Sequence, residues 1–197
     1  MARPRLHSDD AILDAARALV LDSGARSATI NAIADASGAP KGSIYHRFAS
    51  LNDLLAALWI RAVRRSQGEF LDALGHPDAT SAAVAAALSL HDFALRHPAD
   101  ARLLVALRRE DLVARTSTPQ LQSELEALNR PLEAALQSLA RRLYGRATIG
   151  AVERTLTAVV DLPLGAIRRH LVAGTRLPAA LRNQLEAAVR AALAAGS

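Results

Sequence analysis

The sequence predicts an all-α protein, because its composition and its apolar spacing both favour helices. Of the 197 residues, 51% are hydrophobic and only 3% are aromatic, so the core must be built mainly from Ala and Leu. These are among the best helix formers, whereas β-branched and aromatic residues favour strands. Apolar residues recur at helical spacing from end to end, without a strand pattern. We expect about nine helices.

Three short helices are expected first along the chain. The first begins at the N-cap Ser8 and ends at Gly24. The second starts after Thr29 and breaks at Gly38, where a tight turn needs a positive φ angle. The third covers about residues 40–47. Together they predict a compact head made of short helices.

Longer helices are expected in the rest of the chain. A capping box at Ser50–Asp53 opens the fourth helix, which ends at Gly75. Five more helices are expected at residues 78–96, 99–114, 118–144, 148–173 and 178–195. Pro163 lies inside one of them, and a proline removes a backbone donor and clashes one turn back. We therefore predict a kink that frees the carbonyl of Val159, with Asp161 beside it.

The composition argues against several classes of function. There is no cysteine, which excludes disulfides, thiolate metal sites and cysteine nucleophiles. The six histidines show no ligand spacing, and we find no phosphate-binding glycine loop. We therefore expect no catalytic residues, no metal and no cofactor, and the protein is not expected to be an enzyme.

The charge and the ends of the chain bear on partners and location. The net charge of +5 is compatible with nucleic acid, although an arginine-rich composition accounts for it equally well. Residues 2–10 are charged and do not read as a signal peptide. The longest apolar run falls short of the roughly 20 residues that a membrane span needs. A cytoplasmic protein without membrane contact is expected.

The most informative stretch covers residues 29–48, which predict a helix, a tight turn and a second helix. Ala34 is small where the two helices approach each other. The apolar residues spaced to pack this pair on the first helix are Ile30, Ile33, Ile44 and Phe48. The residues left facing outward on the third helix are Lys41, Ser43, Tyr45, His46 and Arg47. Such small, polar and cationic side chains suit a helix laid in the major groove of DNA.

This stretch resembles the TetR family of bacterial transcriptional regulators. The matching residues are Thr29, Ile33, Ala34, Ser37, Gly38, Lys41, Gly42, Ser43, Tyr45 and Phe48, and the resemblance covers about residues 8–60. It implies a helix-turn-helix DNA-binding domain over residues 1–50 and an effector-binding and dimerisation domain over residues 51–197. It also implies a repressor that binds a palindromic operator in double-stranded DNA as a homodimer and is released by a small-molecule effector.

Carried onto this sequence, the resemblance assigns DNA contacts to individual residues. Thr29 and Asn31 would meet the DNA backbone at the start of the second helix. The residues that would face bases are Lys41, Gly42 and Ser43, with Pro40 close by. The residues that would hold phosphates are Tyr45 and Arg47, assisted by His46. One departure is Leu51, which stands where the family often has a phosphate-binding lysine. That single contact is in question, whereas the fold is not.

The candidate effector pocket is drawn from residues on several helices. They are Trp59, His91, Leu95, Leu104, Leu107, Arg108, Val159 and Asp161. Packing is a competing interpretation for three features of this set. His91 lies on an apolar stripe and is better explained as a core histidine with a satisfied partner. Trp59 suits packing as well as a pocket, and the kink at Pro163 is slightly better explained as a bend around the core.

The last two helices are expected to form the dimer interface. Their small and aliphatic residues suit a four-helix contact between protomers, and these are Ile167, Leu171, Leu181, Leu185, Ala188, Val189 and Leu193. The alternative function is a helical small-molecule-binding protein that does not bind DNA. That alternative predicts a disrupted recognition helix, but residues 40–47 keep the full pattern. Salt-dependent DNA affinity would separate the two functions.

Overall fold

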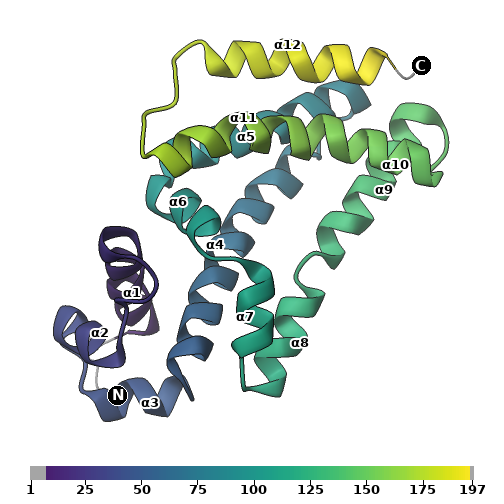
Figure 1. Cartoon of the computed structure of the whole chain (residues 1–197). Coiled ribbons are helices and arrows are strands. Elements are labelled where there is room, and N and C mark those ends of the chain that lie inside the picture. Colours follow the sequence, from purple (N-terminus) through teal and green to yellow (C-terminus); the bar gives the residue numbers. More distant parts are fainter. Residues whose placement is uncertain (1–7, 196–197) are drawn as a thin grey trace, which may run out of the picture. The chain divides into compact units, whose positions relative to one another are not determined.

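The computed structural model describes residues 8–195 and confirms the all-α prediction, with no strand in that range (Figure 1). The N-terminal residues 2–7, expected not to belong to a signal peptide, lie outside the described part. The helices are α1 Asp9–Ser23, α2 Ile30–Ser37, α3 Lys41–Arg47, α4 Leu51–Ala73, α5 Ala79–Arg96, α6 Pro98–Ala106, α7 Arg109–Arg115, α8 Pro119–Ala127, α9 Arg130–Tyr144, α10 Ile149–Leu156, the π-helical turn η1 Thr157–Asp161, α11 Leu162–Ala173 and α12 Leu181–Ala194.

The chain forms two compact units. Among the described residues, unit 1 contains 8–63 and 102–128, and unit 2 contains 64–101 and 129–195. The helices α4 and α6 therefore each contribute to both units. The predicted division after residue 50 is a functional one, and it stays a prediction beside this division by contacts.

Three of the expected helices are interrupted, which is why the segments outnumber the nine expected. The helix expected at residues 99–114 is broken at Arg108, whose backbone is extended (φ −95°, ψ 132°). The helix expected at residues 118–144 is broken around Asn129, and Pro131 follows in the first turn of α9. A proline is accommodated in a first helical turn, where its missing N–H has no partner to lose.

The third interruption is the one that Pro163 predicted. It takes the form of the π-helical turn η1, in which the N–H of Leu162 donates to the carbonyl of Thr157. Such hydrogen bonds, between residues five positions apart, accommodate a local irregularity in an α-helix. Val159 is fully buried, whereas Asp161 is exposed.

Unit 1 is built around the predicted short-helix head. The fully buried side chains Ile12 of α1, Ile33 of α2 and Ile44 of α3 meet Leu54 and Leu58 of α4 in one core. Gly38 ends α2 with φ 69°, which confirms the predicted positive φ at the turn. The head is therefore packed on the first half of α4.

Unit 2 is centred on the alanine-rich helix α5, against which α9, α11 and α12 pack. Small side chains let the helices approach closely, and the fully buried ones are Ala82, Ala83, Ala86 and Ala87. Five residues expected in the dimer interface are instead buried within this single chain, namely Ile167, Leu181, Leu185, Val189 and Leu193. This corrects the assignment of these five residues to the interface, because an apolar stripe at helical spacing fits an internal core as well. That the last two helices form the interface stays a prediction. None of the described helices combines the length and the apolar character that a membrane span requires.

Candidate nucleic-acid interface

The second helix begins with a side-chain cap at Thr29. Its Oγ1 accepts a hydrogen bond from the N–H of Ala32 at 3.2 Å, which satisfies one of the free amides of the first turn. A threonine hydroxyl that accepts one hydrogen bond still carries its own donor. Because Thr29 and the neighbouring Asn31 are both exposed, their side chains can donate to an external oxygen.

The third helix has one buried and one exposed face. Ile44 is fully buried and Phe48 just after the helix is 8% exposed, so these side chains fix the rotation of α3 on the core. Pro40, Lys41, Gly42, Tyr45 and His46 are exposed, and Ser43 is half-buried. Tyr45 is 56% exposed, which is unusual for a large aromatic side chain in a protein with few of them. The face predicted to meet DNA therefore points to solvent.

Gly42 has no folding role that explains its presence in the first turn of α3. A Cβ placed there would find no heavy atom within 4 Å outside its own helical turn. Glycine in a helix destabilises it by roughly 0.5–1 kcal/mol relative to alanine. Since its φ is not positive and the space beside its Cα is open, Gly42 leaves the first turn of α3 accessible to a close approach from outside.

Arg47 stands apart from the other predicted contact residues. Its Nε lies 3.2 Å from Oδ1 of Asp9, in the first turn of α1, and its side chain is only 17% exposed. Its Nη1 is buried without a hydrogen-bond partner among the described residues. Arg47 thus joins the end of α3 to the start of α1, a role that the sequence did not indicate, and its predicted phosphate contact stays a prediction.

The exposed face of α3 borders an open hollow of about 640 Å³. Its lining residues are Asp9, Gly42, Ser43, His46 and Arg47. The structure thus brings four of the nine predicted DNA contact residues around one hollow.

The first turn of α4 is tied to the loop between α7 and α8 by Asp53. Its carboxylate is 2% exposed and accepts hydrogen bonds from Ser117 N at 3.0 Å and Oγ at 2.9 Å, and from Thr118 Oγ1 at 3.0 Å. Burial alone would raise the pKa of Asp53, but the hydrogen bonds from Ser117, Ser50 and Thr118 outweigh it and hold the pKa below its usual range. This contact holds the first turn of α4 against the loop between α7 and α8.

A second polar contact ties α4 to the head. Arg61 donates from Nη1 to Oδ1 of Asp10 at 2.7 Å and from Nη2 to Oδ1 of Asp14 at 2.6 Å. Burial works to lower the pKa of Arg61, but the two carboxylates outweigh it and raise the pKa, so the guanidinium stays charged. The head is therefore held to α4 by both apolar packing and paired charges.

The predicted effector residues fall in both units. In unit 1, Trp59 and Leu107 are buried, Leu104 is half-buried and Arg108 is exposed. The indole Nε1 of Trp59 is buried without a hydrogen-bond partner in the described chain. In unit 2, His91 and Val159 are buried, whereas Leu95 and Asp161 are exposed. The pocket itself stays a prediction.

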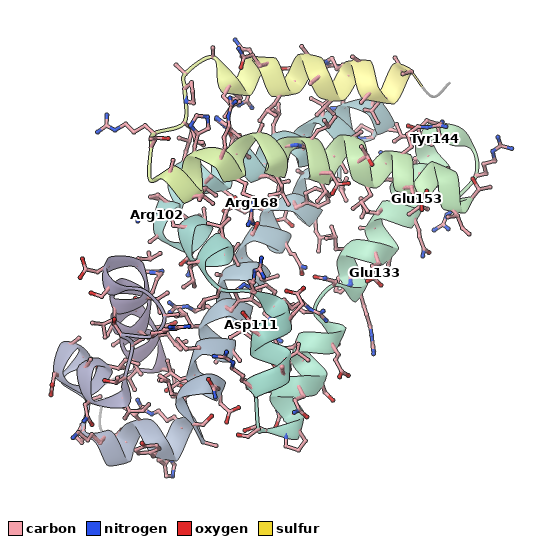
Figure 2. All side chains as sticks on the ribbon, viewed as in Figure 1. Arg102, Asp111, Glu133, Tyr144, Glu153 and Arg168 are labelled. Carbon is pink, nitrogen blue, oxygen red and sulfur yellow. The ribbon has the colours of Figure 1, made fainter. Side chains whose placement is uncertain are left out.

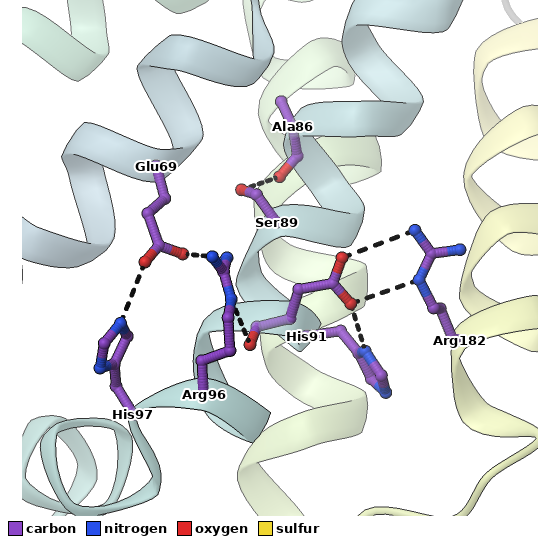
Figure 3. A network of polar contacts seen from close by, with 8 residues as sticks. Glu69, Ala86, Ser89, His91, Arg96, His97 and Arg182 are labelled. Carbon is purple, nitrogen blue, oxygen red and sulfur yellow. Dashed lines mark hydrogen bonds and ion pairs between the residues drawn. The ribbon is translucent and has the colours of Figure 1, made fainter.

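His91 belongs to a network of polar contacts in unit 2, shown in Figure 3. Its Nδ1 lies 3.0 Å from Oδ1 of Asp92, which also receives a hydrogen bond from Nε of Arg182 at 3.3 Å. Burial would raise the pKa of Asp92, but the hydrogen bonds from His91 and Arg182 lower it, so the carboxylate accepts and the His91 ring donates. His91 is therefore a buried histidine with a partner, as the packing interpretation predicts.

Comparison with known proteins places this geometry in context. Residues 12–58 match the family of bacterial regulatory proteins called the tetR family. No curated protein matches the sequence. Solved structures are similar over nearly the whole chain, and at 16–17% sequence identity they show the fold. They confirm that the helical arrangement is the one the resemblance implied.

Three of these solved structures illustrate the match. The TetR family transcriptional regulator PfmR from Thermus thermophilus has a TM-score of 0.71 at 16% identity, covering 93% of this chain and 97% of its own. The fatty acid degradation regulator FadR from Bacillus halodurans has a TM-score of 0.69 at 17% identity, covering 93% of this chain and 98% of its own. The ketosteroid transcriptional regulator KstR2 of Mycobacterium tuberculosis has a TM-score of 0.68 at 16% identity, covering 99% of this chain and 96% of its own.

Proposed function

We propose that this chain, whose residues 12–58 form an N-terminal domain of the tetR family of bacterial regulatory proteins, is a homodimeric transcriptional repressor. It binds a palindromic operator in double-stranded DNA and leaves it when a small-molecule effector binds. Its place of action is the cytoplasm, where bacterial DNA lies. It works by binding alone, and no enzymatic step enters the mechanism.

The observation that carries this proposal is the two-sided character of α3. Ile44 fixes the helix on the core, and the opposite face presents Lys41 and Tyr45 to solvent. Lysine donors read guanine edges in the major groove, and hydroxyls and cations also bind phosphates. The first-turn amides of α3 have no side-chain cap, but that of Ser43 donates to the carbonyl of Pro40 at 2.9 Å, which leaves those of Lys41 and Gly42 available to a DNA oxygen.

The dimer places two such helices in successive major grooves, about 34–36 Å apart. We assign the contact to the exposed face of α11, where Leu164 is 45% and Val172 is 65% exposed. Arg168 lies between them on the same helix (Figure 2). The exposed small residues of α12 extend this face, and they are Ala187, Ala188, Ala191 and Ala194. Small side chains allow two helices of one protomer to pack closely on those of its partner.

The assignment predicts which apolar residues the dimer needs. Replacing Leu164 and Val172 together by glutamate should convert the protein to a monomer at micromolar concentration, because like charges would be buried against each other. Light scattering coupled to size exclusion measures the mass. The matched control is Ile149→Glu on α10, since Ile149 is 80% exposed but lies outside α11 and α12. A variant with both glutamates that remains dimeric would contradict this interface.

Effector release is proposed as a shift between two arrangements of the head. The link runs through α4, whose first turn is held by Asp53 to Ser117 and Thr118. An effector that binds one arrangement better changes the distance between the two α3 helices. The loss of DNA affinity cannot exceed the difference in effector affinity between the two arrangements.

The test is selection of duplexes from a random library by the purified protein. We expect an inverted repeat whose affinity falls steeply with salt concentration, as phosphate neutralisation requires. The proposal would be wrong if no sequence is enriched and duplex binding is absent or independent of salt. That result would favour the alternative of a helical small-molecule-binding protein.

Gly42 gives a prediction in which stability and function move in opposite directions. Gly42→Ala should stabilise the fold by ~0.5 kcal/mol, because a methyl group there meets open space and lowers the entropy of the unfolded chain. The same methyl group should weaken operator binding at least severalfold by holding α3 away from the base edges. Thermal melting and fluorescence anisotropy measure the two effects. Unchanged DNA affinity would remove Gly42 from the interface.

A further inference from the structure

Unit 1 contains a second cavity, which lies away from the exposed face of α3 and has a volume of about 260 Å³. It is bounded by the loop between α1 and α2, the first turns of α4, and the segment from the end of α6 through α7. Four leucines line it, namely Leu51, Leu55, Leu107 and Leu112. We call it the α4–α7 cavity. Pockets for drug-sized ligands measure roughly 300–1,000 Å³, so its occupant must be smaller.

Leu51 gives this cavity part of its apolar wall. It is the residue at which the sequence departs from the family's usual lysine, and it is half-buried against the core of unit 1. The side chain that fails to supply a phosphate contact therefore has another place in the structure, beside Leu55.

The rim of the α4–α7 cavity is cationic. Arg26, Arg108 and Arg115 line it together with one acidic residue, Asp111, which Figure 2 shows on α7. Three positive charges against one negative leave an excess of two. Within residues 8–195 none of these arginines has an ion pair or a side-chain hydrogen bond, and all three are exposed. Their guanidinium groups are therefore available to an anion.

The walls of the cavity are held in place without an occupant. Asp53 ties the first turn of α4 to Ser117 and Thr118, directly after α7. Arg109 at the start of α7 donates from Nη2 to the carbonyl of Leu125 in α8 at 3.1 Å. A site whose walls are already fixed loses little entropy when a ligand binds.

We propose that the α4–α7 cavity binds a small organic monoanion with an apolar body. We take the anionic group to be a carboxylate, which accepts hydrogen bonds from the guanidinium groups that match its planar geometry. The hydrocarbon part of the ligand packs on the leucines. An inorganic phosphate would leave the leucines unused, and a neutral hydrocarbon would leave the arginines unused. The inference rests on the proposed function only in making this anion the effector, because an occupant there contacts both α4 and α7 and selects one arrangement of the two.

The test uses 4-fluorobenzoate as the probe, followed by ¹⁹F NMR with the full chain. The neutral 4-fluorobenzyl alcohol is the matched ligand control. The variant is Arg26→Gln/Arg108→Gln/Arg115→Gln, and the matched protein control is Arg102→Gln/Arg130→Gln/Arg176→Gln, which removes the same charge at exposed arginines outside the cavity. Both variants should fold, since the changes lie at exposed positions, and thermal melting verifies this.

We expect the wild type and the control variant to bind the acid alike, the cavity variant to bind it at least tenfold more weakly, and the alcohol to bind at least tenfold more weakly than the acid. Equal binding of the acid by both variants, or no binding of the acid by the wild type, would overturn the inference. Operator binding is measured in parallel, and if it persists the proposed function stands. If the wild type binds no acid and the cavity variant loses operator affinity, the inference is also overturned, because the three arginines would then bind DNA phosphates. Cavity-dependent binding of the acid by a protein that binds no DNA would uphold the site and refute the proposed function.

Discussion

Replacing Lys41 and Tyr45 together by alanine is expected to lower operator affinity by about 100-fold, from roughly 1–3 kcal/mol for each direct contact. Both side chains are exposed and neither contributes to the core of unit 1. The free energy of unfolding should therefore change by less than about 0.5 kcal/mol. Fluorescence anisotropy on the selected duplex, with thermal melting of the same samples, measures both quantities.

A charge control separates specific contacts from general attraction. The variant Arg141→Ala/Arg146→Ala removes two exposed positive charges from unit 2, outside the head. It should bind the operator nearly as well as the wild type. The variant at Lys41 and Tyr45 should instead lose affinity and show a shallower dependence on salt concentration, because the positive charge of Lys41 is lost from the interface. If both variants lose affinity equally, the assignment of α3 as the reading helix fails.

Removing the carboxylate of Asp53 is expected to have the largest effect on stability. Asp53→Ala leaves the donors of Ser117 and Thr118 without their buried acceptor. Each charged hydrogen bond of this kind contributes roughly 1.5–3 kcal/mol, and the bonds share one acceptor group, so we expect a loss of about 3 kcal/mol. For a chain of this size that lowers Tm by roughly 6–12 °C. The exposed control Asp35→Ala should change Tm by little, and equal shifts in the two variants would contradict the role of Asp53.

The pKa of Asp53 adds a pH dependence to this prediction. Because its pKa is lowered in the folded state, the carboxylate stabilises the fold at every pH above its unfolded value of about 3.9. That stabilisation is lost as the pH falls through the lower, folded pKa. The difference in unfolding free energy between wild type and Asp53→Asn should therefore shrink below about pH 3.9. A difference that stays constant as the pH falls well below the unfolded value of about 3.9 would show that the titration of Asp53 is not linked to folding.

The sequence predicted those features of the head that depend on local spacing. Ile30 and Ile33 before the turn at Gly38, and Ile44 and Phe48 after it, stand at helical spacing, so the exposed face of α3 followed from the residues themselves. The polar contacts that hold the head did not follow. Arg61 pairs with Asp10 across 51 positions, and Asp53 meets Ser117 across 64. No periodicity of a single helix indicates a partner at such a distance.

The helices of the second half show what spacing leaves open. Leu181, Leu185 and Val189 form a stripe that fits an interface between protomers and equally a core within one, and the structure buries it within one chain. Pro163 did indicate an irregular turn, because a missing N–H must leave a carbonyl without its usual partner. Pro131 carried the same kind of signal, which the continuous leucine spacing around it obscured.

Protection of guanine N7 from dimethyl sulfate on the selected operator shows whether α3 lies in the major groove, because that atom is exposed there. We expect two protected clusters on one face of the duplex, centred about 10 base pairs apart and lost in the variant at Lys41 and Tyr45. Protection absent from the major groove, or unchanged in that variant, would contradict this placement of α3.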